Sequence, residues 1–204
     1  MGMTVFFGGT FNPPHNAHKR MIETVLRLPY IDKILVVPTN VPPHKNVKGY
    51  FAGNGDRMEM CRLLCDGMDK TEVSDIEIKR GGKSYSFDTL TELSHIYDNL
   101  GLLIGGDMLT SFNKWYNYKG ILKLATVIAV GRPGIGDEKI ENSMRELEKE
   151  NGNITLLHAD MPDISSTSIR MCAAAGDTET VKRSVPQNIF NYIEGKGLYP
   201  EVKK

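Results

Sequence analysis

The sequence predicts an α/β protein: a doubly wound, mainly parallel sheet with helices on both faces. Short apolar segments rich in Val, Ile and Leu alternate along the chain with segments whose apolar residues recur at helical spacing. Such alternation implies right-handed crossovers, which make the strands parallel and place helices on both sides of the sheet. The 204 residues, 40% of them hydrophobic, are enough to bury the core of one such domain.

The first strand is expected at Thr4 to Phe7, a short apolar segment followed by two glycines. The segments 33–38 (KILVVP) and 125–130 (ATVIAV) are continuous apolar runs, as buried strands are. The segment 72–78 (EVSDIEI) alternates like a third strand. Together the expected strands are 4–7, 33–38, 72–78, 100–104, 125–130 and 154–157.

Helical spacing is clear in the segment 16–28, where Ala17, Met21, Val25 and Leu28 recur every three or four residues. Further helices are expected from the patterns that follow. The full set is 16–28, 56–68, 86–98, 138–150, 166–174 and 187–194. We expect one domain, residues 1–204, with an α/β core over 1–160 and a helical C-terminal segment over 161–204.

Composition excludes several classes of protein. The formal net charge is zero, so no overall field draws the chain to nucleic acid or membrane, and any anion must be held by local groups. No apolar run approaches the roughly 18 residues that span a bilayer, and the N-terminus lacks a signal peptide's features. Cys61 and Cys65 share an apolar helical stripe, which favours core thiols over half of a metal site. We expect a reduced, cytoplasmic protein.

Candidate binding residues follow the predicted strands. Ligands of parallel α/β sheets bind beyond the carboxyl ends of the strands. Those ends carry Gly8-Gly9, then Pro38-Thr39-Asn40, then Gly105-Gly106-Asp107. The segment 38–55, which contains Pro42-Pro43-His44-Lys45, is long enough to be a functional loop.

The first of these ends, Gly8 to His18 (GGTFNPPHNAH), combines two glycines, two prolines and two histidines. Gly8 and Gly9 would let a phosphate or sugar pack against the main chain. Asn16 is a suitable N-cap, and a helix start offers unpaired N–H groups and a partial positive charge. His15 and His18 lie at the same end and can donate to phosphate oxygens. The stretch predicts an anion site; a tight turn with surface histidines is the alternative.

A second candidate anion site is Ile164 to Arg170 (ISSTSIR). Serine and threonine at a helix start can cap any helix, so alone the run would be structural. Arg170, one turn further along, adds a forked cation for the same anion. The two helix starts could hold a triphosphate from opposite sides.

Together these motifs resemble the nucleotidyltransferase superfamily that carries a (T/H)xGH signature and a C-terminal ISSTxxR motif. Within it, the chain is similar to the bacterial nicotinate-nucleotide adenylyltransferases, whose opening motif resembles GGTFDPPHxGH. The similar segments are 8–18, 42–45, 80–90, 105–107, 115, 132–134, 165–170, 185–186 and 198–199. Asn12, Ala17 and Ser86 stand where the family commonly has Asp, Gly and Thr, and we expect these departures to tune the site rather than abolish it.

The resemblance implies a Rossmann-like fold and an adenylyl transfer. The 5′-phosphate of nicotinate mononucleotide attacks the α-phosphorus of ATP in line, and pyrophosphate leaves. That phosphate is already ionised at neutral pH, so catalysis would consist of positioning and charge stabilisation. Mg²⁺ would bridge the phosphate oxygens, held largely by the nucleotide and water, with no metal ligand from the protein.

The resemblance also implies the site residues. His15, His18 and Arg170 would be catalytic, with His18 near the reacting centre. ATP would be bound by Gly8, Gly9, Thr10, Phe11, His15, His18, Gly105, Asp107, Ser165, Ser166, Thr167 and Arg170. The mononucleotide would be bound by Asn40, Lys45, Tyr85, Ser86, Thr89, Trp115 and Arg132. Trp115 would stack on the pyridine ring, and N–H groups near Tyr85 and Ser86 would receive its carboxylate.

Alternatives stay open at this point. Asp107 is equally plausible as a helix cap, Trp115 as a core residue, and Lys45 and Arg132 as solvated cations. An enzyme for nicotinamide mononucleotide or for phosphopantetheine is the nearest rival function, and a non-catalytic nucleotide sensor on the same fold is another. A class I tRNA synthetase core shares the histidine motif, but 204 residues leave no room for its tRNA-binding parts. The expected partners are ATP and nicotinate mononucleotide, with a homo-oligomer possible.

Overall fold

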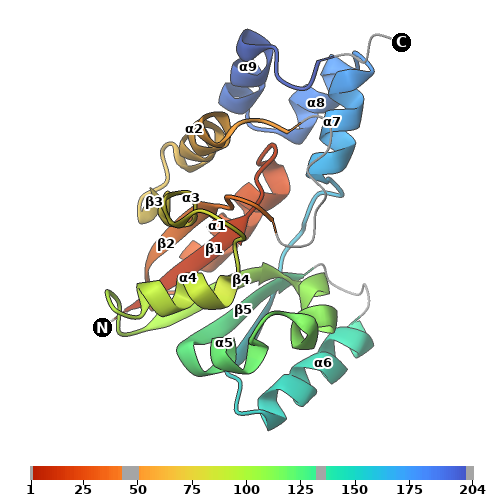
Figure 1. Ribbon diagram of the computed structural model, residues 1–204. Coiled ribbons are helices and arrows are strands. Elements are labelled where there is room, and N and C mark those ends of the chain that lie inside the picture. Colours follow the sequence, from red (N-terminus) through yellow and green to blue (C-terminus); the bar gives the residue numbers. More distant parts are fainter. Residues whose placement is uncertain (1, 43–50, 132–136, 201–204) are drawn as a thin grey trace.

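The computed structural model describes residues 2–42, 51–131 and 137–200, and within them a six-stranded sheet runs through the centre of the molecule (Figure 1). The strands are β1 (Met3–Gly9), β2 (Ile31–Pro38), β3 (Thr71–Val73), β4 (Leu100–Gly105), β5 (Ala125–Gly131) and β6 (Ile154–His158). Their order is β3-β2-β1-β4-β5-β6, and every neighbouring pair is parallel. The expected doubly wound parallel sheet is therefore confirmed.

The strand order reverses between β1 and β4, and crevices for ligands form at such a switch point. Gly9 at the end of β1 pairs with Pro38 at the end of β2, and Gly105 ends β4. All three lie at the carboxyl edge of the sheet because the strands are parallel. This edge is where the candidate residues of the sequence collect.

Helices cover both faces of the sheet. They are α1 (Asn16–Leu26), α2 (Asn54–Cys65), α3 (Ile76–Arg80), α4 (Ser86–Leu93), the 3-10 helix η1 (Gly106–Lys114), α5 (Tyr118–Leu124), α6 (Asp137–Lys149), α7 (Ser166–Ala174), α8 (Thr178–Ser184) and α9 (Gln187–Lys196). No helix in the described part of the chain is long and apolar enough to cross a membrane.

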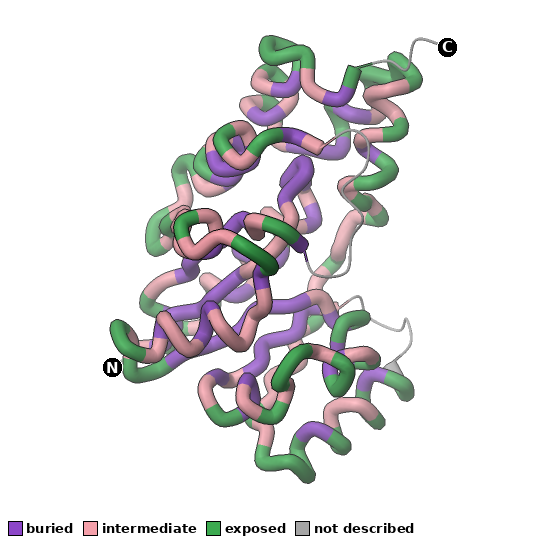
Figure 2. The backbone as a smooth tube through the Cα atoms, viewed as in Figure 1, coloured by how far each residue is buried: buried purple, intermediate pink, exposed green. Residues whose placement is uncertain are grey.

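Two hydrophobic clusters lie on the two faces, as alternation along β1 requires. Val5 and Phe7 belong to one cluster with residues of α1, α2 and α9, whereas Phe6 belongs to the other with residues of α4, α5 and α6. The tube of Figure 2 shows the buried residues concentrated in the central strands. Cys61 is buried in the first cluster, so the core-thiol interpretation is confirmed.

The C-terminal helices lie beside α2, at the end of the molecule away from α5 and α6 (Figure 1). On α9, Ile189 and Ile193 are buried in the first cluster. The amide of Asn188 donates to the carbonyl of Leu63, and the hydroxyl of Tyr192 donates to Asp56. The division at residue 160 stays a prediction, although α7, α8 and α9 all fall after it.

The expected strand over 72–78 is wrong in its second half. β3 ends at Val73, and Ile76–Arg80 forms α3. The hydroxyl of Ser74 accepts the N–H of Ile76, which turns the chain before the helix starts. Glu77 is consequently buried instead of facing solvent as strand alternation would place it. The helices α5 and α8 were not expected; Asn117 and Asp177 cap them through their side chains.

Candidate active site

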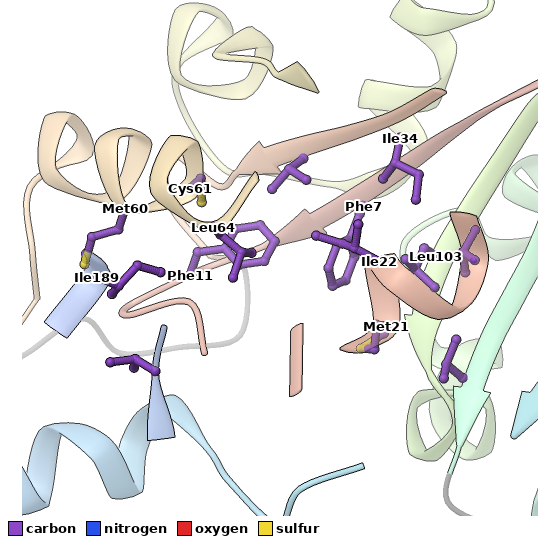
Figure 3. Close-up of a cluster of buried hydrophobic side chains, with 14 of the residues drawn as sticks. Phe7, Phe11, Met21, Ile22, Ile34, Met60, Cys61, Leu64, Leu103 and Ile189 are labelled. Atoms are coloured by element: carbon purple, nitrogen blue, oxygen red, sulfur yellow. The ribbon is translucent and has the colours of Figure 1, made fainter. Parts of the chain in front are cut away.

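The loop between β1 and α1 is fixed by its main chain. Phe11 has a φ of +46°, in the left-handed region that a bulky residue rarely occupies. Its ring is buried in the first cluster near Phe7 and Leu64 (Figure 3), with 5.3 Å between the Phe7 and Phe11 ring centroids. The burial of this ring supports a backbone conformation that would otherwise be strained.

Four carbonyl oxygens of the loop accept hydrogen bonds from other elements. Their donors come from the end of β2, from α2 and from α7, far apart in sequence. The bonds are Thr39 N–H to Gly9 (2.9 Å), Arg57 Nη1 to Thr10 (2.9 Å), Arg170 Nη1 to Asn12 (2.7 Å) and Ser166 Oγ to Pro13 (2.8 Å). The two motifs that the sequence places near opposite ends of the chain are therefore in direct contact.

Packing requires glycine at positions 8 and 9, in addition to the predicted role of these residues in binding. A Cβ on Gly8 would lie 2.6 Å from the ring of Phe6, and one on Gly9 would lie 2.9 Å from the ring of Phe11. Both distances are shorter than real Cβ contacts. These glycines let aromatic rings close against the loop from inside, and they also line the cavity described below.

His15 and His18 stack on each other at the start of α1, with 3.7 Å between ring centroids. The backbone N–H of His15 donates to Nδ1 of His18 (3.1 Å). A neutral His18 therefore carries its proton on Nε2, which is the donor atom of the ring. Burial lowers the pKa of His15 to about 4, so this ring is uncharged at neutral pH.

The start of α7 is a capping box. The hydroxyl oxygen of Ser165 accepts the N–H of Ser168, and the hydroxyl oxygen of Ser168 accepts the N–H of Ser165. Arg170 bonds Thr167 (3.3 Å) besides the loop carbonyl of Asn12. Of the predicted phosphate-binding residues here, Ser166 and Arg170 both hold the loop, whereas Thr167 is exposed.

A cavity of about 230 Å³ opens beside this loop, at the carboxyl ends of β1 and β2. Aromatic side chains dominate one side of it: the rings of Tyr85 and Tyr116 lie 4.7 Å apart, and Trp115 packs 5.0 Å from Phe112. Trp115 thus contacts the core and also lines the cavity. The lining residues are Phe6, Gly8, Gly9, Thr10, Thr39, Pro42, Glu77, Ser84, Tyr85, Ser86, Trp115, Tyr116 and Ile121.

The N-terminus of α4 forms part of the same wall. Ser86 is the first residue of α4, and no side chain caps its N-terminus. Ser84 donates its N–H to the carbonyl of Val41, which ties this segment to the end of β2. Tyr85 and Ser86 line the cavity, so the start of α4, with its partial positive charge, borders it.

Two predicted ligand contacts, Thr89 and Asn40, are not among the residues that line the cavity. Thr89 is fully buried: its hydroxyl donates to Glu77 (2.7 Å) and accepts from Arg80 (2.9 Å). Asn40 donates to the carbonyl of Gly82 and accepts from the amide of Asn54. Both side chains join the segments that carry the lining residues.

The remaining predicted residues are placed as follows. Gly105 ends β4 and Asp107 lies exposed in the first turn of η1, whose N-cap is Gly105 without a side-chain cap. Asp107 is therefore not the N-cap that the alternative interpretation supposed. Lys45 and Arg132 lie outside the described residues.

Sequence reasoning missed several residues of the site. Glu77 is buried and lines the cavity, and burial raises the pKa of its carboxyl. Arg57 is buried beneath the loop. Tyr199 donates to the side-chain oxygen of Asn12, which also accepts the N–H of Ala52. For Arg57, the only signal in the sequence is a charged residue within an apolar helical pattern. Such a residue usually lies on the solvent-exposed face of its helix.

Within the described ranges, no group of three or more His, Cys, Asp or Glu side chains is arranged to hold a metal ion.

Three comparisons with known proteins complete the description. Residues 6–172 match the family model described as cytidylyltransferase-like. A Listeria welshimeri protein named probable nicotinate-nucleotide adenylyltransferase is 36% identical over 196 residues, 94% of each chain. The Clostridium tetani protein of that name is 32% identical over 98% of this chain and 100% of its own. The solved Plasmodium falciparum nicotinic acid mononucleotide adenylyltransferase complexed with NaAD shares the fold, with a TM-score of 0.79, 19% identity and 98% of both chains covered.

Proposed function

The chain belongs to the nicotinate-nucleotide adenylyltransferase family, and on this premise we propose that it joins ATP and nicotinate mononucleotide into nicotinate adenine dinucleotide and pyrophosphate. The observation that carries the proposal is the position of the aromatic cavity directly beside the loop 8–15, at the switch point of the sheet. A pyridine nucleotide in the cavity would present its phosphate to an ATP held on the loop.

We assign the ATP phosphates to the loop and to the starts of α1 and α7. His18 is uncharged when its Nδ1 accepts the N–H of His15, and its Nε2–H can donate to an oxygen of the reacting phosphate. Arg170 and Thr167 would contact the β- and γ-phosphates. The attacking phosphate needs no base, so these residues would orient the two phosphates in line and stabilise the charge that develops.

We assign the pyridine ring to the cavity, against Trp115 and Tyr85. Backbone N–H groups at the start of α4 would receive the ring's carboxylate, since a helix start favours an anion. Thr89 and Asn40 would act indirectly by holding the cavity wall. Lys45 and Arg132 remain candidates for the mononucleotide phosphate, and a homo-oligomer remains a prediction.

We also propose a Mg²⁺ requirement. The ion would neutralise the triphosphate, bridging its oxygens with water as the remaining ligand. Pyrophosphate release should therefore stop in excess chelator and return with added Mg²⁺. Full activity in chelator would remove the metal from the proposal.

One observation favours a second candidate, preference for nicotinamide mononucleotide. Glu77 lines the cavity, and as a carboxylate it would accept a hydrogen bond from an amide and repel an acid. Burial works against this, because it raises the pKa of Glu77 and so disfavours the carboxylate form. The helix start of α4 favours the acid as well.

The test is kcat/KM for both mononucleotides at saturating ATP and Mg²⁺, followed by pyrophosphate release. Charge-assisted bonds to the acid, and donors left unpaired by an amide at about 1–3 kcal/mol each, predict a preference for the acid of roughly 10- to 10⁴-fold. Equal values, or a preference for the amide, would contradict the acid-selective assignment.

A further inference from the structure

Arg57 on α2 is a buried cation whose hydrogen bonds go to uncharged groups. It is 0% exposed and heads the largest fully buried side chains. Its Nη1 donates to the carbonyl of Thr10 (2.9 Å) and its Nη2 to the side-chain oxygen of Asn54 (2.6 Å). The guanidinium lies 4.9 Å from the ring centroid of Phe51. An arginine buried in this way carries a large desolvation cost, so its charge needs an explanation.

Planar peptide geometry gives the bond to Thr10 a directional consequence. The carbonyl of Thr10 and the N–H of Phe11 belong to one trans peptide group and point in opposite directions. Arg57 holds the carbonyl toward the interior, so the N–H of Phe11 points away from Arg57. Thr39 acts likewise on the carbonyl of Gly9, which turns the N–H of Thr10 away from β2.

These two N–H groups have no acceptor within residues 2–42, 51–131 and 137–200. They are consecutive, and Phe11 has the left-handed backbone that concave anion-binding turns use. Thr10 also lines the cavity. Unpaired main-chain donors on one side of a loop, with a buried positive charge on the other, form a site for an anion with more than one charge.

We propose that Arg57 is a positioning residue for the triphosphate of ATP. It holds the peptide group between Thr10 and Phe11 so that the N–H groups face the phosphates, and its charge adds to the field there. The anion in turn compensates the buried charge. This inference rests on the proposed function, which assigns the loop to ATP, and it gives a role to a residue outside the two phosphate motifs.

Asn54 offers a way to test the charge apart from the fold. Its oxygen accepts from Arg57, and its amide donates to Asn40 (2.9 Å). Asn54→Asp would keep an acceptor for Arg57 at the same place and would pair the buried cation with a carboxylate. The compensating role of the anion would then be lost, although Arg57 itself would remain.

The experiment measures the affinity of the full chain for inorganic pyrophosphate with Mg²⁺, and separately for nicotinate mononucleotide, by calorimetry. We expect Arg57→Met to weaken pyrophosphate binding by about 10- to 100-fold, the scale for a hydrogen bond to a charged group. Arg57→Lys should fall between, because lysine keeps the charge but cannot form the fork. Asn54→Asp should weaken binding several-fold. Mononucleotide affinity should change by less than about twofold in the two Arg57 variants, because Arg57 bonds none of the aromatic residues of the cavity. Asn54→Asp also loses the amide that donates to Asn40, so only its pyrophosphate affinity bears on the inference.

The matched control is Arg62→Met, on the same helix but exposed and paired with Glu59, and it should leave both affinities unchanged. A folded Arg57→Met that binds pyrophosphate within twofold of the wild type would overturn the inference, as would equal losses for both ligands. If Arg57→Met does not fold, unchanged pyrophosphate affinity in both Arg57→Lys and Asn54→Asp would overturn it. If pyrophosphate binding depends on Arg57 but the protein makes no dinucleotide, the proposed reaction is refuted and the role of Arg57 in anion binding stands.

Discussion

The loop 8–15 and the aromatic cavity adjoin each other but are built in different ways. The loop is held through its main chain: four of its carbonyls accept bonds from three other elements, and its core residue Phe11 is buried. The cavity includes aromatic side chains in its lining, and one of them, Tyr116, is 55% exposed. Phosphate is the same in every nucleotide, so a fixed backbone can bind it, whereas a ring that stacks on aromatic side chains is held by residues that can differ between enzymes.

The largest effect is expected at His18, the side chain that we assign to the reacting phosphate. His18→Ala should lower kcat by about 10²-fold or more, the scale for losing one donor to developing charge. Pyrophosphate release under saturating substrates measures it. His95→Ala, an exposed histidine away from the site, is the control. Turnover near that of the wild type would return His18 to a packing role against Phe11 and His15.

Arg170 should show a mixed effect, because it both bonds the carbonyl of Asn12 and is assigned to the phosphates. Arg170→Ala should raise KM for ATP and lower kcat, with kcat/KM down by about 10- to 100-fold. Arg170→Lys should recover only part, since lysine lacks the fork. A raised KM for the mononucleotide alone would mean that the two halves of the site are assigned in reverse. Arg145→Ala, an exposed arginine of α6, is the control.

Trp115 tests the cavity. Trp115→Ala should lower kcat/KM for both mononucleotides by about 10-fold, because stacking contributes roughly 0.5–1.5 kcal/mol beyond burial for either ring. The ratio between acid and amide should change little, since the carboxylate is assigned to the start of α4. Trp115→Phe should restore most of the activity. A collapsed ratio would move the specificity from the backbone to Trp115.

Tyr199 should show the smallest effect, on stability. Its buried hydroxyl donates to the side-chain oxygen of Asn12 (2.8 Å). In Tyr199→Phe that oxygen would still accept the N–H of Ala52. Tyr199→Phe should cost about 1 kcal/mol, or about 2–4 °C in melting temperature, with kcat changed less than threefold. Tyr30→Phe, 45% exposed, is the control. A large loss of activity would show that the loop is less rigid than its backbone bonds imply.

The sequence predicts the repetitive parts of this molecule well. Apolar runs located five of the six strands, and hydroxyls before an apolar stripe located α7 with its bounds, because both depend on local chemistry. It misplaced Ile76–Arg80, since alternation over seven residues does not distinguish a strand from a turn followed by a short helix. The same error predicted that Glu77 would face solvent, whereas its side chain is buried.

The site is predicted in part for a similar reason. Motifs identified the loop and the start of α7, but a motif does not tell whether a side chain reaches the cavity or holds its wall. Thr89 and Asn40, expected to contact the ligand, bond neighbouring segments in this structure, and their contact with a ligand stays a prediction. Arg57 could not be predicted, because nothing local distinguishes a charge under a loop from one in solvent. Its partner Thr10 is 47 residues away.

The bond between Asn12 and Tyr199 joins residues 187 positions apart, and the bonds of Ser166 and Arg170 to the loop span more than 150. A ribosome makes the first of these residues long before the last. The donors that fix the carbonyls of Asn12 and Pro13 are therefore among the last residues to be synthesised. A chain that ends before Ser166 lacks them, so the first loop of the protein takes its final hydrogen bonds only when the last helices are present.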